Sequence, residues 1–265
     1  MGYDERRWAG KWALVTGASA GIGRSLAEQL AAGGANLALT ARRRERLEEL
    51  ASKLRAAHSI KTEIFATDLA QPNAPAEIRA FTEAKNLEIE LLINNAGFGA
   101  YGALHKSDLA RQLEMIQVNC AAVVHLTRLY LPEMVARGHG DILIVASIAA
   151  FQAVPFISTY AATKAFDLLF AEGIAEEVRR HGVHVCALCP GSTTTEFREV
   201  AGQPEHTFRG AETAEKVARV GLRALAAEKS SVISGLKNKL SVEGQRLAPR
   251  SLVTRVAAGM FDPGK

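Results

Sequence analysis

The sequence predicts an α/β protein whose helices cover a parallel β-sheet on both faces. Short apolar segments alternate along its 265 residues with segments of helical periodicity, which is typical of this fold class. Several apolar segments lack a polar face, as strands buried on both sides require. Because helical crossovers are right-handed almost without exception, the main candidate is a single doubly wound, Rossmann-type domain with a mostly seven-stranded parallel sheet.

The expected elements follow one another without an internal repeat or a long linker. The expected strands are 11–17, 36–41, 62–68, 89–97, 141–147, 183–189 and 231–234. The expected helices are 21–32, 42–57, 74–85, 107–137, 159–181 and 213–228. We therefore predict one domain over residues 1–265, in which 235–265 is a C-terminal helical extension with apolar positions on one helical face.

Composition and charge exclude several function classes. The formal net charge is +4 and no basic tract is interleaved with aromatics, so a nucleic-acid partner is not expected. The start of the chain lacks the apolar core of a signal peptide. The longest apolar window, 142–157, falls short of the roughly 20 residues that a membrane-spanning helix needs. These features predict a cytoplasmic protein without a membrane partner. The basic segment after Lys229 fits a solvated helix face, an acidic ligand, a partner or a membrane surface.

The cysteines do not suggest a metal centre. Cys186 and Cys189 form a C-x-x-C pair, a spacing that redox and zinc sites share. However, the pair lies in an expected strand, where residues three apart point to opposite faces, and no second pair completes a zinc site. We predict buried structural thiols and no metal.

A glycine-rich turn follows the first expected strand. The stretch TGASAGIG permits a tight turn and a close backbone approach to a pyrophosphate at a helix N-terminus. Its spacing is G-x-x-x-G-x-G, and its place between a strand and an apolar-periodic helix favours a dinucleotide site. The candidate cofactor-binding residues here are Gly17, Ser19, Gly21, Ile22 and Gly23.

The end of the second expected strand indicates which dinucleotide binds. An NAD site expects an acidic residue at this point, but the chain has Ala41 followed by Arg42, Arg43 and Arg44. A guanidinium holds a 2′-phosphate by donating charge-assisted hydrogen bonds to its oxygens, whereas a carboxylate would repel it. We therefore predict NADP(H), with Arg42 as the first contact and Arg43 as the second.

Further polar or small residues follow later strands, where ligands bind in sheets of this type. Each has a structural explanation by itself, such as a cap, a turn or a strand end. Their order and spacing together make coincidence implausible. They are Asp68, Leu69, Asn95, Ala96, Gly97, Asn119 and Ser147.

The stretch YAATK places a phenol one helical turn before an amine. If the segment is helical, Tyr160 and Lys164 lie on one face. A nearby ammonium favours the phenolate and lowers the pKa of the tyrosine. The pair could therefore perform acid–base chemistry that neither group would perform alone near neutral pH.

These motifs together resemble the short-chain dehydrogenase/reductase family over roughly residues 10–234. The resemblance implies that Tyr160 is the general acid in carbonyl reduction, that Ser147 binds the substrate oxygen, and that Lys164 binds the nicotinamide ribose and lowers the pKa of Tyr160. It implies that Asn119 holds a water that links Lys164 to solvent. It also implies cofactor contacts near the nicotinamide from Pro190, Gly191, Thr193 and Thr195.

The resemblance implies an NADP(H)-dependent oxidoreductase that interconverts a carbonyl (ketone, aldehyde or 3-oxoacyl group) and an alcohol. The alternative is a non-catalytic NADP(H)-binding regulator on the same fold, which would not need Ser147 and Tyr160 together. A sugar-nucleotide epimerase of the extended branch fits less well, because the chain is short and the glycine spacing differs. A homodimer or homotetramer is implied. A largely apolar substrate pocket is expected from Phe98, Tyr101, Ala149, Phe151, Pro155, Phe156, Phe197 and Phe208, and the segment 192–210 is expected to close over it.

Overall fold

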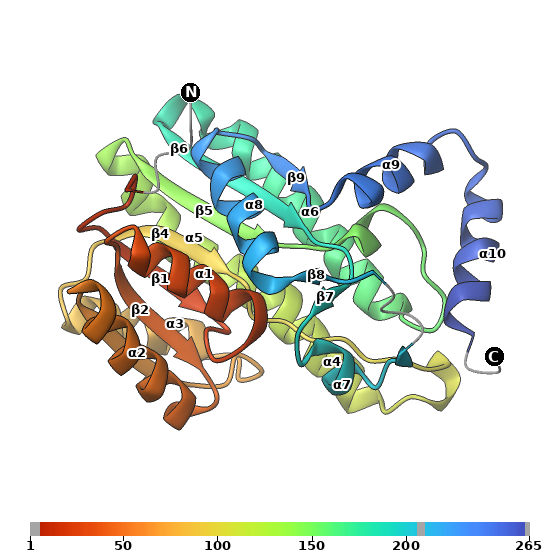
Figure 1. The fold of residues 1–265 in the computed structure, drawn as a ribbon, viewed down its shortest axis with the longest axis horizontal. Coiled ribbons are helices and arrows are strands. Elements are labelled where there is room, and N and C mark those ends of the chain that lie inside the picture. Colours follow the sequence, from red (N-terminus) through yellow and green to blue (C-terminus); the bar gives the residue numbers. More distant parts are fainter. Residues whose placement is uncertain (1–5, 206–209, 263–265) are drawn as a thin grey trace.

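The computed structural model describes residues 6–205 and 210–262 and confirms the predicted sheet (Figure 1). Seven parallel strands form it in the order β3-β2-β1-β4-β5-β6-β9. The order reverses between β1 and β4, and such a switch point is where open α/β sheets bind ligands. The strands are β1 (Trp12–Thr16), β2 (Asn36–Ala41), β3 (Thr62–Ala66), β4 (Ile89–Asn94), β5 (Gly140–Val145), β6 (Val183–Cys189) and β9 (Ser231–Ile233).

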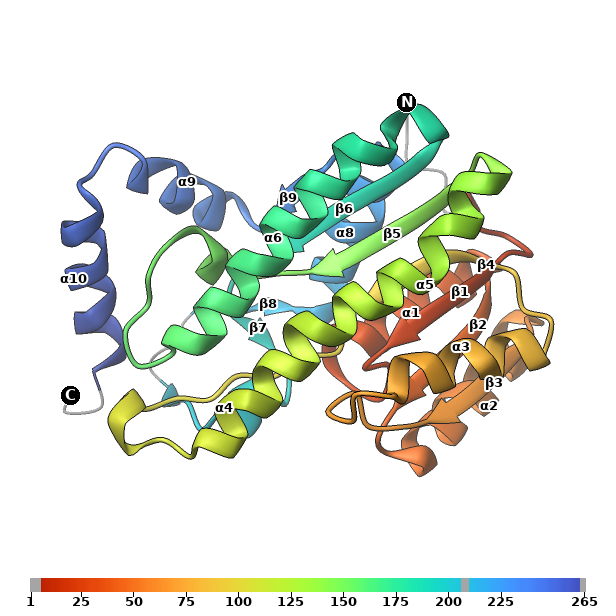
Figure 2. The ribbon, with the colours of Figure 1, turned by 180° about the vertical axis from the view of Figure 1, so that it is seen from behind.

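Helices cover both faces of the sheet, as a doubly wound fold requires (Figures 1 and 2). One face packs against α1 (Gly21–Ala32), α2 (Arg44–His58) and α8 (Ala214–Ala226). The other face packs against α3 (Ala74–Ala84), α5 (Ala122–Arg137) and α6 (Ser158–Val178).

Alternating residues of each strand supply the two hydrophobic cores. Val15 packs in the first core and its neighbour Leu14 in the second, as the two-residue period of a strand dictates. Cys186 and Cys189 divide between the same two cores, so the thiols point to opposite faces as predicted. Burial raises the pKa of both thiols to about 12. They therefore serve as packing groups.

The helix expected over 107–137 is in fact divided. A 3-10 turn, η1 (Leu104–Lys106), precedes α4 (Leu109–Ile116), and a π-helical turn, η2 (Gln117–Ala121), separates α4 from α5. The Asp108 side chain caps α4 by accepting a hydrogen bond from the Ala110 amide at 2.9 Å. A π-turn inserts an extra residue into a helix and frequently marks a functional site. Asn119 lies inside this turn.

Short elements surround the carboxyl ends of the central strands. A 3-10 turn, η3 (Ile148–Phe151), follows β5, and another, η4 (Arg179–His181), ends α6. A small second sheet, which sequence periodicity did not predict, pairs β7 (Thr193–Thr194) with β8 (Glu212–Thr213). The helix α7 (Phe197–Ala201) lies between these two strands in the sequence. This group borders the ligand-binding end of the sheet.

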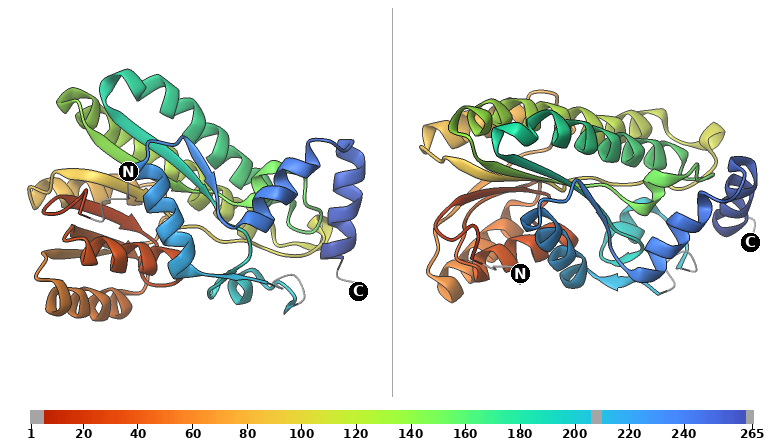
Figure 3. Two further views of the ribbon diagram at one scale, coloured as in Figure 1. Left: turned by 45° about the horizontal axis from the view of Figure 1, so that its top comes forward. Right: turned by 90° about the horizontal axis from the view of Figure 1, so that it is seen from above.

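The C-terminal segment forms two helices, and the expected apolar face falls mainly on the second of them. They are α9 (Leu236–Gln245) and α10 (Arg250–Phe261), and Pro249 directly precedes α10. Figure 3 shows them at one end of the sheet, standing away from its layers. Ala257 of α10 is buried among residues around η3 and the start of α6. The apolar side chains that remain exposed on this pair are Leu236, Leu240, Leu252, Val256 and Met260.

Candidate active site

The glycine-rich turn after β1 packs directly against the loop after β4. Gly17 adopts a φ of +66°, a conformation that favours glycine. The Asn95 side chain donates to the Thr16 carbonyl at 2.8 Å and ties the two loops together. A Cβ on Gly23 would lie 2.3 Å from the Asn95 amide nitrogen and 2.4 Å from the Gly17 carbonyl oxygen. The cradle therefore admits no side chain at position 23.

Gly23→Ala should destabilise the protein and weaken binding of a dinucleotide. The added methyl group would displace backbone, and overpacking of this kind costs about 1–3 kcal/mol. Thermal unfolding and cofactor titration measure the two effects. Gly173→Ala in α6 is the matched control, because a Cβ there meets nothing within 4 Å and alanine favours the helix. A Gly23→Ala variant as stable as the control would contradict the tight cradle.

One cavity of about 400 Å³ connects nearly all of the predicted site residues. It runs along the carboxyl ends of the strands, from the glycine-rich turn to η3 and α10. Gly23 and Asn119 support this cavity without lining it. The predicted residues that line it are Gly17, Ser19, Gly21, Ile22, Arg42, Arg43, Asp68, Leu69, Asn95, Ala96, Gly97, Ser147, Tyr160, Lys164, Pro190, Gly191, Thr193 and Thr195.

Basic side chains gather at the end of the cavity next to β2. Arg43 donates to Ser19 of the glycine-rich turn at 3.3 Å and forms an ion pair with Glu196 at 2.7 Å. Arg46 pairs with the same carboxylate at 2.5 Å, and hydrogen bonds from Arg46 and Arg43 hold the pKa of Glu196 below its ordinary value. Sequence reasoning missed Glu196, because it lies some 150 residues from its partners.

Asn119 fixes the loop after β4 against α6. Its side-chain oxygen accepts from the Phe98 amide at 3.1 Å. Its side-chain nitrogen donates to the Phe98 carbonyl and to the Thr163 hydroxyl, both at 3.0 Å. A Cβ on Gly97 would lie 3.1 Å from the Asn119 side-chain oxygen and 3.4 Å from the Lys164 amine. The Asn119 amide thus has a positioning role, and its link to a water stays a prediction.

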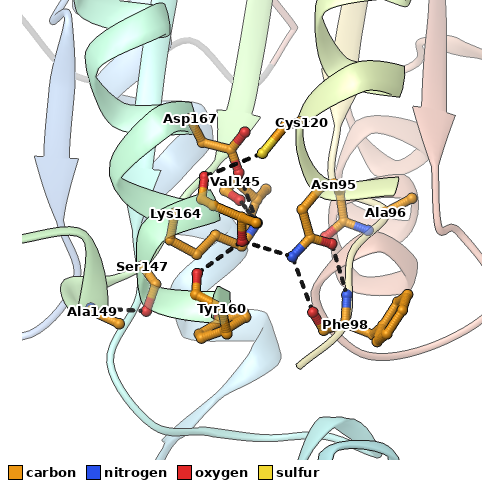
Figure 4. A network of polar contacts seen from close by, with 12 residues as sticks. Asn95, Ala96, Phe98, Cys120, Val145, Ser147, Ala149, Tyr160, Lys164 and Asp167 are labelled. Carbon is orange, nitrogen blue, oxygen red and sulfur yellow. Dashed lines mark hydrogen bonds and ion pairs between the residues drawn. The ribbon is translucent and has the colours of Figure 1, made fainter. Parts of the chain in front are cut away.

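Ser147, Tyr160 and Lys164 lie together at the middle of the cavity (Figure 4). Ser147 follows β5 and caps η3, where its hydroxyl accepts from the Ala149 amide at 3.1 Å. Tyr160 and Lys164 lie one turn apart on α6, as predicted from YAATK. The Lys164 amine donates to the Val145 carbonyl at 2.7 Å and to the Asp167 carboxylate at 2.9 Å.

Burial controls the acid strength of Tyr160. It raises the pKa of the phenol above its ordinary value, whereas the Lys164 cation and a hydrogen bond with Ser147 lower that pKa. Lys164 lowers the pKa of Tyr160, as expected, but desolvation raises that pKa by more. Without a bound cofactor, the pKa of Tyr160 is therefore not shifted toward neutral pH.

Apolar side chains line the far end of the cavity. Phe98, Ala149 and Phe197 lie there as predicted, whereas Tyr101, Phe151, Pro155 and Phe156 do not line it, and Phe208 lies outside the described residues. The Phe197 ring lies 5.1 Å from the Tyr160 ring, centroid to centroid. The sequence did not suggest Ile148, Ile157 or Phe261 as walls.

Phe261 reaches the cavity from the end of α10. The Tyr101 hydroxyl donates to the Phe261 carbonyl at 2.8 Å, and Ala257 anchors the same helix. The last helix is therefore part of the wall around the apolar end. Helical periodicity alone does not reveal which residues pack against a site 100 positions earlier in the chain.

A family model described as short chain dehydrogenase matches residues 11–206. The chain belongs to the short-chain dehydrogenase family. The predicted family is therefore confirmed. Members of this family are oxidoreductases that bind a nicotinamide cofactor.

Curated relatives of this short-chain dehydrogenase are reductases by name. The very-long-chain 3-oxoacyl-CoA reductase-A of Danio rerio is 36% identical over 195 residues, which are 72% of this chain and 60% of the relative. The Homo sapiens very-long-chain 3-oxoacyl-CoA reductase is 34% identical over 195 residues, which cover 72% of this chain and 62% of that protein. The chain thus spans about 60% of the length of these relatives.

Solved structures of short-chain dehydrogenases share the whole fold. A 7beta-hydroxysteroid dehydrogenase structure superposes with a TM-score of 0.86 at 28% identity, covering 96% of this chain and 99% of the other. A short-chain dehydrogenase from Sphingobium yanoikuyae in complex with NADPH gives a TM-score of 0.82 at 29% identity, with 92% and 95% of the two chains covered.

The expected cytoplasmic localisation is contradicted by the curated relatives. Their names specify very-long-chain 3-oxoacyl-CoA, and a long acyl chain partitions strongly into membranes. The prediction rested on the charged start of the chain and on the short apolar window, which do not report where a substrate resides. Over residues 6–205 and 210–262, no helix combines the length and the hydropathy needed to cross a bilayer.

Proposed function

We propose that this short-chain dehydrogenase reduces the carbonyl group of an apolar substrate with NADPH, using Ser147, Tyr160 and Lys164. The observation that carries the proposal is the single cavity. The basic side chains, the Ser–Tyr–Lys group and the apolar side chains all line this one cavity. A chain that only sensed the cofactor would not need a serine and a tyrosine hydroxyl beside the lysine.

The residues of the cradle fit a phosphorylated dinucleotide. Gly17 and Gly23 leave no room for a side chain where backbone must approach a pyrophosphate. Ser19, Arg42 and Arg43 line the neighbouring part of the cavity, where no carboxylate follows β2 directly. They would hold a 2′-phosphate through charge-assisted hydrogen bonds. The complex of the Sphingobium yanoikuyae protein with NADPH supports the same choice.

The bound nicotinamide supplies the hydride, and the chain supplies position and the proton. Ser147 would donate a hydrogen bond to the carbonyl oxygen, and the Tyr160 hydroxyl would transfer its proton to that oxygen as negative charge develops. Lys164, one turn away, favours the phenolate that remains. Lys164 and Gly97 both line the cavity, and the third N–H of the amine would hold a ribose hydroxyl there.

The apolar end favours a substrate with a large hydrocarbon part. The apolar side chains that line it are Phe98, Ile148, Ile157, Phe197 and Phe261. The names of the curated relatives support a 3-oxoacyl thioester, whereas the 7beta-hydroxysteroid dehydrogenase likeness supports a bulky cyclic ketone. We propose the 3-oxoacyl thioester first, because those relatives have the higher sequence identity.

The chain is proposed to work as a homodimer or homotetramer. Helix α4 and helix α6 contact one another and both lie on the side of the molecule seen in Figure 2. Both helices carry exposed apolar side chains. A second copy would remove these side chains from water. They are Leu109, Leu113, Ile116, Phe166 and Leu169.

An assay of NADPH oxidation tests the proposal. The purified chain is offered 3-oxoacyl thioesters of increasing chain length, bulky ketones and small aldehydes, with the Tyr160→Phe variant in parallel. We expect turnover that depends on Tyr160 and increases with the length of the acyl chain. Tight NADPH binding without turnover on any substrate would instead support the regulator.

A further inference from the structure

A buried carboxylate lies directly behind the lysine of the proposed site. Asp167 is 1% exposed and follows Lys164 by three residues on α6. Its Oδ2 atom accepts from the Lys164 amine at 2.9 Å, while its Oδ1 atom is buried with no hydrogen-bond partner. A buried carboxylate is costly without a compensating charge, so its presence here requires an explanation.

The contact determines how Lys164 uses its three N–H groups. One donates to the Val145 carbonyl at 2.7 Å and a second donates to Asp167. One partner is the carbonyl at the end of β5 and the other is a carboxylate on α6. A single N–H is therefore left for the cavity, and Figure 4 shows the Lys164 side chain joined to Asp167.

The carboxylate also opposes the cost of burying the amine. Desolvation lowers the pKa of Lys164, but the charge of Asp167 raises it, and the net pKa lies above the ordinary value. Burial in turn raises the pKa of Asp167 above its ordinary value, although the nearby Lys164 lowers it. Each charge is thus the main stabiliser of the other, and removal of one partner would leave the second uncompensated.

We infer that Asp167 is a positioning residue that keeps Lys164 protonated and directs its one remaining N–H toward the cavity. The inference rests on the proposed function, because it assigns Asp167 a role in that reaction. Asp167 touches no part of the cavity itself, and it acts only through the lysine.

Other titratable groups around the pair are few among the described residues. Tyr160 lies on the same helix, and its pKa responds to both Lys164 and Asp167. From η2, Cys120 faces the pair, and burial raises the pKa of its thiol to about 11. From β6, Cys189 faces Lys164 with a pKa of about 12. These thiols are neutral near pH 7, so Asp167 is the group that balances the lysine charge.

Asp167→Asn tests the inference, because the amide keeps the shape of the side chain and removes its charge. With the negative charge gone, desolvation dominates and the pKa of Lys164 falls below its ordinary value. We expect the alkaline limb of kcat/KM for carbonyl reduction to move down by about one pH unit or more. Asp167→Glu keeps the negative charge, so its alkaline limb should lie between those of Asp167→Asn and the wild type. An active Asp167→Asn enzyme with the wild-type pH profile would overturn the inference.

A substrate-free measurement separates this inference from the proposed function. The ¹³Cε shift of Lys164, assigned with Lys164→Met, should titrate above the ordinary lysine pKa in the wild type and below it in Asp167→Asn. An unchanged titration overturns the inference even if no substrate is turned over. A wild-type chain without Tyr160-dependent turnover overturns the proposed function instead.

Two further variants guard against a folding artefact. Glu172→Gln, on the same helix, removes an acid that hydrogen-bonds to Ser231 at 2.8 Å, and it should keep the wild-type pH profile. On a Lys164→Met background, Asp167→Asn should cause no further loss of turnover, because the residue acts through the lysine. An additional loss of tenfold or more in that double variant would contradict the inference.

Discussion

Tyr160→Phe should reduce carbonyl turnover by about 10²–10⁴-fold, the usual contribution of a general acid. The substitution removes the one hydroxyl that would transfer the proton and keeps the ring. The ring should remain against Phe197, which it contacts at 5.1 Å between centroids. Affinity for NADPH should therefore change by less than about threefold, since the cradle and the arginines are untouched.

Steady-state rates and a fluorescence titration with NADPH measure the two quantities. Tyr130→Phe is the matched control, because Tyr130 is also buried and its hydroxyl lies 2.9 Å from the Thr82 hydroxyl, away from the cavity. The control should keep wild-type kcat. If Tyr160→Phe retained a tenth or more of wild-type activity, the assigned acid would be wrong.

Removal of both arginines after β2 should convert the cofactor preference. The double variant Arg42→Ala, Arg43→Ala loses the cations that would hold a 2′-phosphate. Charge-assisted hydrogen bonds contribute about 1.5–3 kcal/mol, so NADPH affinity should fall by roughly 10- to 150-fold. NADH lacks that phosphate, and its affinity should change by less than about threefold.

This prediction is tested by measuring the dissociation constants of NADPH and NADH for the wild type and the double variant. Arg44→Ala is the control, because Arg44 begins α2, pairs with Glu48 at 3.8 Å and does not line the cavity. Equal weakening of both cofactors in the double variant would show that the arginines support structure and do not recognise the phosphate.

The sheet could be predicted because its residues obey a simple period. Leu14 and Val15 alternate between two cores, and both are apolar because both faces are covered. Gly17 and Gly23 could be predicted because only glycine permits the turn and the close approach that the cradle requires. The spacing of Tyr160 and Lys164 correctly placed both on one face of a helix.

The remaining features depend on contacts between distant parts of the chain. Asn119 is a poor helix residue within a helical pattern, which suggests a special role. The sequence does not reveal that a π-turn places its side chain against Phe98. In the sequence, Asp167 looks like an acidic residue on the exposed face of a helix. The structure shows that it is paired with the Lys164 amine. Phe261 enters the site only because α10 returns to the start of α6. The assignment of 1–265 as one domain with an extension stays a prediction.

Glu196 and Phe197 are consecutive residues, and they contact two different parts of the proposed site. Glu196 pairs with Arg43 beside the phosphate end, and Phe197 packs against Tyr160. Because one peptide unit joins the two contacts, we expect changes at Arg43 and at Tyr160 to have non-additive effects on catalysis. An engineered change of cofactor preference at Arg43 should therefore be screened together with the range of substrates accepted. The two properties should not be optimised one after the other.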